Sequence, residues 1–382
     1  WPLDQAEPLA ATISARTDNN PLFVRAYLRW LFDQGALAYS SEREAWIWDP
    51  ARAVAAPDDD LVALMTRRLG ALGPDAQRAL QAAACIGARF TRRRLAAVLG
   101  RPEHEVAEAL ADAIERGLVQ PAGPDALEFV HDKVQQAAYD ALPDDERLRL
   151  HLELGRGLLR DTPPAALDDL LFEITGHLNL AAARISGADE RVRLAELDLA
   201  AGRKASRAAA FATAVHHLRQ GIAALPDDSW SARYPLTFAL HCECMKCEHF
   251  AGDPEAAAAR FAPLLARART DLDRAEVYEL KVGLDTDRGD AREALDTGLT
   301  GLALLGVRLP LCMSWLALMR ELATVRILRG RTPLRAFAEL PEAHDPRIVR
   351  ALKLLGRTCA AVYSIEPDLS LVYLLRALAL TL

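Results

Sequence analysis

The stretch GDPEAAAARFAPLLARA, from Gly252 to Ala268, decides the fold, because GDAREALDTGLTGLALL, from Gly289 to Leu305, repeats its plan 37 residues later. In each stretch a Gly-Asp pair closes one helix and opens another that is rich in alanine and leucine. An earlier unit, ASRAAAFATAVHHLRQGIAAL, follows the same plan without the Gly-Asp pair, and its Ala210 lies 42 residues before Gly252. These spacings bracket tetratricopeptide (TPR)-like helix pairs, whose small residues allow close packing. We therefore predict a TPR-like α-solenoid over residues 143–382.

Composition supports a mainly α fold. The chain has 382 residues, of which 51% are hydrophobic and 26% charged, so it can bury two or three cores. Alanine, leucine, arginine and glutamate dominate, and these residues favour helices. The formal net charge of -7 argues against a general nucleic-acid binder, which needs a concentrated basic surface.

The sequence shows no signal peptide and no membrane span. A span needs roughly 18 consecutive apolar residues, and Arg308 interrupts the best candidate, around Leu299 to Leu322. We expect a cytoplasmic protein. The chain opens on Trp1 and stops at Leu382 inside an apolar helical run, so we also expect it to be a fragment of something longer.

Residues 57–142 have the pattern of a winged-helix domain. The expected elements are four helices and a hairpin wing: Leu61 to Leu72, Asp75 to Ile86, Arg92 to Leu99, Glu103 to Arg116, and Leu118 to Gln120 paired with Leu127 to Val130. The fourth helix is the one that would enter a DNA groove, and it is strongly acidic. Phosphate would repel it, so we expect no nucleic-acid partner.

Residues 1–56 are expected to form a small helical domain with a short hairpin. After a helix from Leu3 to Arg16, Asn20 is a candidate N-cap and Pro21 a candidate first residue of the next helix, which Gly35 ends. The stretch LAYSSEREAWIWD then alternates polar and apolar residues around a turn, which predicts the hairpin.

The stretch HCECMKCEH, from His241 to His249, allows two interpretations. Three thiols and two imidazoles within nine residues could bind zinc. On a helix, however, Cys244 and Cys247 share a face with His241 while Cys242 points elsewhere, so small buried thiols are the alternative. All six cysteines of the chain fit a reducing compartment.

No catalytic motif is present. The sequence contains no Walker A string, no kinase H-R-D or D-F-G set, no G-x-S-x-G and no H-E-x-x-H. We expect no catalysis by this chain alone.

Four strings carry a resemblance to a known family: TDNNPLFVRAYL, AWIWD, FVHDKVQQAAYDAL and HLELGRGLL. They resemble the region just C-terminal to the nucleotide-binding core of the signal-transduction ATPases with numerous domains (STAND). The nearest subgroup is the bacterial one that joins a Ser/Thr kinase-like domain to GAF and histidine-kinase modules. The resemblance implies that residues 1–56 end the small helical (lid) domain of the ATPase, and that a winged helix and a superhelical sensor follow. ATP or ADP would be held by a nucleotide-binding core outside this chain.

The resemblance also implies two nucleotide contacts. Family members usually carry Gly-x-Pro where this chain has Asn19, Asn20 and Pro21, and the proline packs on the adenine. Asparagine tolerates the left-handed backbone conformation, so the turn is expected to survive. The alternative is a plain helix start.

His131 resembles the histidine by which the winged helix of such ATPases senses the β-phosphate of ADP. An imidazole can donate a hydrogen bond to phosphate, and the helix from Asp132 to Ala141 adds a partial positive charge. We expect Asp132 to be the N-cap of that helix. A histidine at the end of a strand can also be purely structural.

Two functions remain open. In the first, the chain is a regulatory segment of a multidomain signalling ATPase, in which the winged helix is an ADP-dependent latch and the helical repeats bind a protein or small-molecule effector. In the second, it is a nucleotide-independent TPR-type scaffold. A DNA-binding regulator would need a basic C-terminal domain that this chain lacks.

Overall fold

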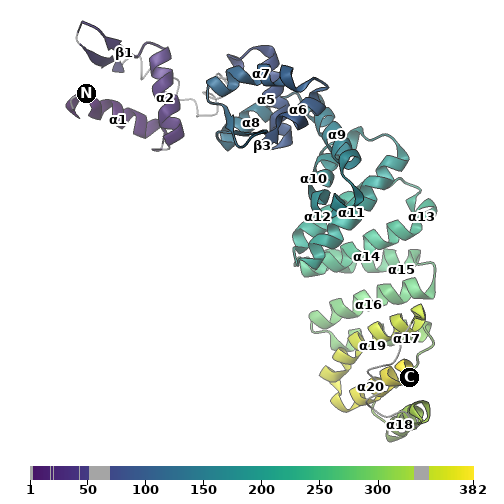
Figure 1. The fold of residues 1–382 in the computed structure, drawn as a ribbon. Coiled ribbons are helices and arrows are strands. Elements are labelled where there is room, and N and C mark those ends of the chain that lie inside the picture. The colour runs from purple at the N-terminus through teal and green to yellow at the C-terminus, as the bar shows by residue number, and fades with distance from the viewer. Residues whose placement is uncertain (1–2, 18, 20, 43, 51–68, 331–343) are drawn as a thin grey trace. The chain divides into compact units, whose positions relative to one another are not determined.

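The computed structural model describes residues 3–17, 19, 21–42, 44–50, 69–330 and 344–382, and most of these residues lie in helices (Figure 1). The predicted mainly α class is confirmed. The chain divides into two compact units, Trp1–Leu158 and Leu159–Leu382. The expected domain boundaries at 56/57 and 142/143 stay predictions.

The first unit contains these elements in chain order: α1 (Leu3–Thr17), α2 (Pro21–Asp33), β1 (Leu37–Ser40), β2 (Ala45–Trp48), α5 (Pro74–Ile86), β3 (Arg89–Thr91), α6 (Arg92–Leu99), α7 (Glu103–Glu115), β4 (Val119–Pro121), β5 (Ala126–Phe129), α8 (Asp132–Asp140) and α9 (Asp144–Asp161), whose last turn crosses into the second unit.

The second unit contains these elements: η1 (Pro164–Ala166), α10 (Leu167–Leu180), η2 (Ala182–Arg184), α11 (Ala188–Arg207), α12 (Phe211–Ala224), α13 (Ser229–Ala232), α14 (Tyr234–Phe250), α15 (Pro254–Arg267), α16 (Asp271–Asp287), α17 (Ala291–Leu304), α18 (Trp315–Arg329), α19 (Pro346–Ile365) and α20 (Pro367–Thr381).

The N-terminal elements follow the predicted order. Helix α2 begins at Pro21, and strands β1 and β2 pair antiparallel with Ser40 opposite Ala45. Their core contains Ile13 and Leu31, which are almost fully buried. The predicted hairpin is therefore present.

Residues 74–140 form a winged helix with one strand more than the sequence indicated. The sheet order is β3-β5-β4 and both pairings are antiparallel, so the wing strands β4 and β5 are joined by β3 between α5 and α6. Strand β3 was missed because three residues are too few to show an alternating pattern. It is defined by its pairing with β5, in which Arg89, Phe90 and Thr91 lie opposite Glu128, Leu127 and Ala126. The expected helix from Leu61 to Leu72 lies largely outside the described residues.

One side of α7 is acidic. Glu103, Glu108 and Glu115 are exposed, whereas Val106 and Leu110 are fully buried in the winged-helix core. The apolar side therefore holds the helix in place and the carboxylates face solvent. This arrangement agrees with the reasoning against a DNA partner, which stays a prediction.

The second unit is a stack of antiparallel helix pairs, as the sequence predicted: α11 with α12, α14 with α15, α16 with α17, and α19 with α20 (Figure 1). The first helices of successive pairs contact one another, α11 with α14, α14 with α16 and α16 with α19. Each second helix contacts the first helix of the next pair, as α12 contacts α14 and α15 contacts α16. This is the connectivity of a TPR-like solenoid.

The turns inside three successive pairs are the same. Ala209, Gly252 and Gly289 all have positive φ, of 56°, 88° and 84°. The N–H of the following residue bonds to the carbonyl five residues earlier at 2.9 Å in each turn, as in Asp253 to Glu248, which is a Schellman closure. Ala209, not Ala210, therefore corresponds to Gly252, and the first spacing is 43 residues.

Glycine lets adjacent helices approach closely at several positions, of which Gly202 and Gly301 are two. A Cβ at Gly202 of α11 would lie 2.5 Å from Leu218 Cγ of α12. A Cβ at Gly301 of α17 would lie 2.7 Å from Leu354 of α19 and 2.8 Å from Tyr278 of α16. These distances are too short for real Cβ contacts, so close packing depends on glycine there.

Among the described residues, no helix is long and apolar enough to cross a membrane.

Candidate functional site

Tertiary contacts on both sides fix the position of His131 in the winged helix. The residues just before it continue strand β5, since Phe129 N–H donates to Ala88 O at 2.9 Å and Val130 N–H to Leu118 O at 3.2 Å. Helix α8 follows and packs on α5, where Gln135 Nε2 donates to Ala84 O at 3.1 Å. The imidazole is thus held at the junction of sheet and helix, with 27% of its side-chain surface exposed.

The structure assigns the N-cap of α8 to His131, not to Asp132 as the sequence predicted. His131 has extended backbone angles, and its Nδ1 accepts the Lys133 N–H at 3.1 Å. Asp132 is the first helical residue, and its carboxylate accepts the same N–H at 2.7 Å. The expectation was wrong because the chain leaves the strand at His131, and an imidazole nitrogen there can take the capping role.

The surroundings of His131 place its Nδ1 at the start of α8. Nδ1 faces the Lys133 N–H, from which it can accept, and the Asp132 carboxylate, to which it can donate. Which of the two contacts is a hydrogen bond depends on the tautomer of the ring. Nε2 can donate to a phosphate oxygen in the charged ring and in the neutral tautomer that carries its proton on Nε2.

The backbone amides of α8 contribute less than the sequence suggested. The N–H groups of Lys133, Val134 and Gln135 are engaged, the first by the side chains of His131 and Asp132 and the others by the His131 carbonyl. Only the helix dipole is left to favour an anion, and the adjacent Asp132 carboxylate opposes it.

The turn before α2 has the backbone that the resemblance requires at Asn19. This residue is exposed and has φ of 58°, in the left-handed region that asparagine tolerates and glycine prefers. Pro21 is exposed and begins α2. Asn20, the expected N-cap, lies outside the described residues. A contact of this turn with adenine stays a prediction.

The three cysteines of α14 are buried: Cys242, Cys244 and Cys247. Cys242 belongs to an apolar cluster with Phe238 and Met245. Burial raises the pKa of all three thiols, and it raises that of Cys244 to about 12. In the part of the chain that the structure describes, no three His, Cys, Asp or Glu side chains are grouped as metal ligands. The structure places these thiols as packing groups.

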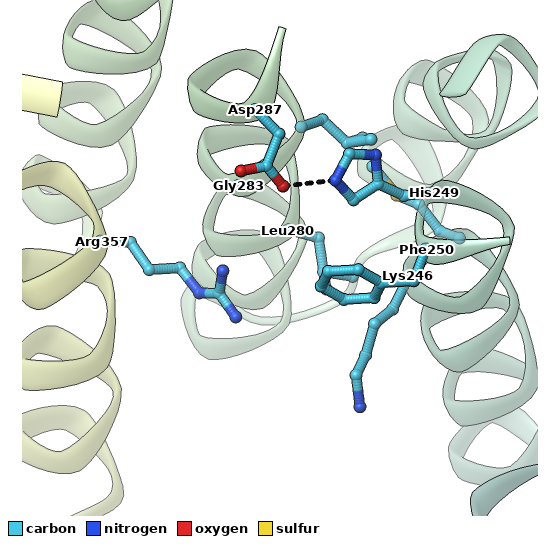
Figure 2. A pocket seen from close by; sticks show the side chains of 9 residues that line it. Lys246, His249, Phe250, Leu280, Gly283, Asp287 and Arg357 are labelled. Carbon is cyan, nitrogen blue, oxygen red and sulfur yellow. Dashed lines mark hydrogen bonds and ion pairs between the residues drawn. The ribbon is translucent and has the colours of Figure 1, made fainter. Parts of the chain in front are cut away.

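Three of the first helices of the pairs line a shallow hollow, shown in Figure 2, in which charged and apolar side chains are mixed. The hollow has a volume of about 20 Å³, enough for one water, and is lined by side chains of α14, α16 and α19. His249 of α14 contacts Asp287 of α16 through a 2.5 Å Nε2 to Oδ2 bond, and Arg357 reaches from α19 toward Gly283 (Figure 2).

Ion pairs cross each junction between first helices. Arg203 of α11 pairs with Glu243 of α14 at 3.0 Å. Arg350 of α19 pairs with Glu276 and Glu279 of α16 at 2.6 and 2.8 Å. Such partly exposed pairs contribute about 1 kcal/mol or less each, so they set the register of the stack more than its stability.

Another side of α14 carries a buried carboxylate that was not expected from the sequence. Glu248 is 1% exposed and accepts bonds from Arg219 of α12 at 2.8 and 3.0 Å and from Arg260 of α15 at 2.5 and 2.9 Å. Burial raises its pKa, but these hydrogen bonds outweigh burial and leave the pKa lowered. The three residues come from three helices, so no local motif reveals them. The one signal in the sequence is that Glu248 is an acidic residue on a side of α14 where apolar residues would be expected.

Comparisons with known proteins give two similarities. No protein-family model matches the sequence. The chain is 25% identical over 336 residues to hybrid signal transduction histidine kinase G of Dictyostelium discoideum, which covers 72% of this chain and 10% of that protein. The chain thus spans about a tenth of the length of this relative.

Among solved structures, a STAND protein with a tetratricopeptide repeat sensor from Pyrococcus horikoshii covers 83% of this chain and 49% of that chain, with 14% identity and a TM-score of 0.31. At the level of sequence, the chain is similar to a region of a signal-transduction protein.

Proposed function

We propose that this chain is a regulatory segment of a multidomain signal-transduction ATPase. The winged helix acts as an ADP-dependent latch, and the helical repeats are a platform for a protein or small-molecule effector. The observation that carries the proposal is the geometry of His131, a partly exposed imidazole held at the junction of strand β5 and helix α8 with Nδ1 facing the start of the helix. The similarity to a hybrid histidine kinase supports a signalling role.

In this proposal a nucleotide-binding core on the same polypeptide holds ATP or ADP, and this chain supplies contacts from outside it. His131 donates to the β-phosphate, while the turn of Asn19, Asn20 and Pro21 lies against the adenine. ADP then favours a closed arrangement of core and winged helix, and exchange for ATP releases it. The shift is limited by how differently the two nucleotides bind the two arrangements.

The test replaces His131 in the polypeptide that carries both this chain and its nucleotide-binding core. Because a hydrogen bond to a charged group contributes about 1.5–3 kcal/mol, His131→Ala should weaken ADP binding roughly tenfold or more. Titration with a fluorescent ADP analogue measures the change. His104→Ala, an exposed histidine on α7, is the matched control and should bind ADP normally. Unchanged ADP affinity in His131→Ala would contradict the latch and leave the nucleotide-independent scaffold.

A substitution at Asp132 should change the affinity for ADP in the opposite direction. Its exposed carboxylate lies beside the His131 ring, where it opposes a phosphate. Asp132→Asn keeps an oxygen acceptor for the Lys133 N–H and removes the charge, so ADP should bind a few-fold more tightly at low salt, since exposed charges interact weakly. The same titration detects this gain, and weaker binding would contradict the proposed geometry.

A further inference from the structure

A pocket in the helical repeats carries an excess of positive charge. It lies between α12, α14 and α15, on a different side of α14 from the hollow of Figure 2, and has a volume of about 390 Å³. That volume lies within the range of small-molecule sites. Its polar lining consists of Arg219, Arg260, Arg267, His241 and Glu248.

The charges in this pocket do not balance. Among the described residues that line it, Glu248 is the one carboxylate, and it is shared by Arg219 and Arg260. Arg267 makes no ion pair with any described residue; its guanidinium lies 4.9 Å from the centre of the Trp230 ring. Arg219 also pairs with the Asp253 carboxylate at 3.7 Å, outside the pocket lining. Three guanidinium groups and two carboxylates leave one positive charge. Burial and the neighbouring Arg260 and Arg267 lower the pKa of His241 to about 4, so its ring is neutral at pH 7 and does not change this sum.

The geometry of the arginines favours an oxyanion. Glu248 accepts from Nε and NH2 of both Arg219 and Arg260, so the two guanidinium groups are oriented before any ligand arrives. Nδ1 of His241 faces Arg260 NH1 at 3.3 Å as an acceptor. Fixed guanidinium groups bind phosphate through paired N–H bonds, and little conformational entropy is lost when they do so.

The remaining walls are apolar. Ala256, Ala259, Pro263 and Leu264 of α15 line one side, and Trp230 lies opposite Arg267. A ligand that matches this lining is anionic at one end, with several oxygens that can accept from more than one guanidinium group, and has a small apolar body at the other. We propose that this pocket binds a phosphate monoester with a flat apolar group, of the aryl phosphate type. The binding step is independent of the proposed nucleotide latch, because it needs only this chain.

The test is calorimetric titration of the 382-residue chain with phenyl phosphate, benzoate and benzyl alcohol. The three probes share a ring and carry two, one and no negative charges at pH 7.5. Phenyl phosphate should bind at least about tenfold more tightly than benzoate, and benzyl alcohol should not bind, since each charge lost removes charge-assisted hydrogen bonds. Equal affinity for all three, or no binding of phenyl phosphate at 150 mM salt, would overturn the proposal.

Two variants locate the site. Ala259→Glu places a negative charge on an exposed wall of the pocket and should abolish phenyl phosphate binding. Ala303→Glu makes the same substitution at an exposed position of α17 and should leave binding unchanged. Arg267→Gln, which breaks no ion pair among the described residues, should weaken binding severalfold while circular dichroism stays unchanged. If Ala303→Glu lowers affinity as much as Ala259→Glu, binding is not at this pocket.

Trp230 gives an independent readout. Phenyl phosphate should change the tryptophan fluorescence of the wild type, and Trp230→Phe should remove that change. A phosphotyrosyl tetrapeptide tests the source of the phosphate: binding no tighter than that of phenyl phosphate supports a small ligand, and much tighter binding overturns that assignment.

Discussion

Glu248 in α14 and Asp285 in α16 occupy the same place in two successive repeats, four residues before Gly252 and Gly289, and both are 1% exposed. Arginines from two neighbouring helices reach Glu248. Asp285 accepts from Lys281 of its own helix and from Thr297 of α17 at 3.3 Å. The fold thus places a carboxylate at the same buried position in both repeats. The residues on the neighbouring helices determine which groups bind it.

The repeat numbering shows where the difference arises. Arg219 lies ten residues after Ala209, and the residue ten after Gly252 is Ala262. Arg260 lies eight residues after Gly252, and the residue eight after Gly289 is Thr297. The second repeat therefore lacks both arginines, and the positively charged pocket belongs to the first.

Substitution of the two carboxylates should give the largest difference in stability between the repeats. Glu248→Gln leaves two guanidinium groups without their partner and should destabilise the chain by about 3 kcal/mol. Asp285→Asn should cost about 1 kcal/mol, since one lysine and one hydroxyl are affected. Urea denaturation at pH 7 measures both, and equal costs would mean that the arginines do not distinguish the repeats.

Helix packing differs between the same two repeats. Phe261, nine residues after Gly252, packs edge-on against Tyr278, whereas Gly298, nine after Gly289, lets Thr358 of α19 approach. A Cβ at Gly298 would lie 2.2 Å from Thr358 Oγ1. Gly298→Ala should therefore cost about 2 kcal/mol through overpacking.

Gly283→Ala is the control for this substitution. The added Cβ would meet the flexible end of Arg357 at 2.9 Å, so the side chain can move aside. The higher helix propensity of alanine should make this change neutral or slightly stabilising. Thermal unfolding distinguishes the two variants.

The turns give a smaller effect. Ala209 has the left-handed backbone that glycine provides in the next two repeats, so Ala209→Gly should stabilise the chain by about 1 kcal/mol. Gly252→Ala should cost a similar amount. No gain from glycine at position 209 in thermal unfolding would show that this turn is not the counterpart of Gly252.

The smallest effect is on the pH dependence of stability. The contributions of Glu248 and Asp285 should change with pH in opposite directions. The lowered pKa of Glu248 means that its stabilisation is present above the unfolded pKa of 4.5 and is lost as pH falls through the folded pKa. Burial raises the pKa of Asp285, and Lys281 only partly offsets this, so its contribution is greatest below 3.8 and declines as pH rises through the folded pKa.

The difference in free energy of unfolding between wild type and Glu248→Gln should therefore grow from pH 3.5 to 7. The corresponding difference between wild type and Asp285→Asn should shrink over the same range. A tenfold difference in proton affinity between the folded and unfolded chain corresponds to about 1.4 kcal/mol, so both changes should be of this size or smaller. Parallel changes would contradict the assigned directions.

Much of the fold was readable from local signals, and the errors have local causes. Gly252 and Gly289 indicated the turns at their positions, because glycine favours a positive φ. Alanine gives no such indication at position 209, so the turn of the first repeat was predicted one residue too late. His131 lies just after strand β5, as expected, but the capping role was predicted for Asp132 because aspartate is the better intrinsic cap. The arginine pocket was not predictable, since side chains from three helices meet there only after the repeats stack.

The nucleotide content of the intact polypeptide as purified tests the proposed function most directly. Acid extraction followed by anion-exchange chromatography should recover close to one ADP per chain from the wild type and far less from His131→Ala, with His104→Ala like the wild type. Equal ADP in wild type and His131→Ala, or no nucleotide in either, would contradict the latch.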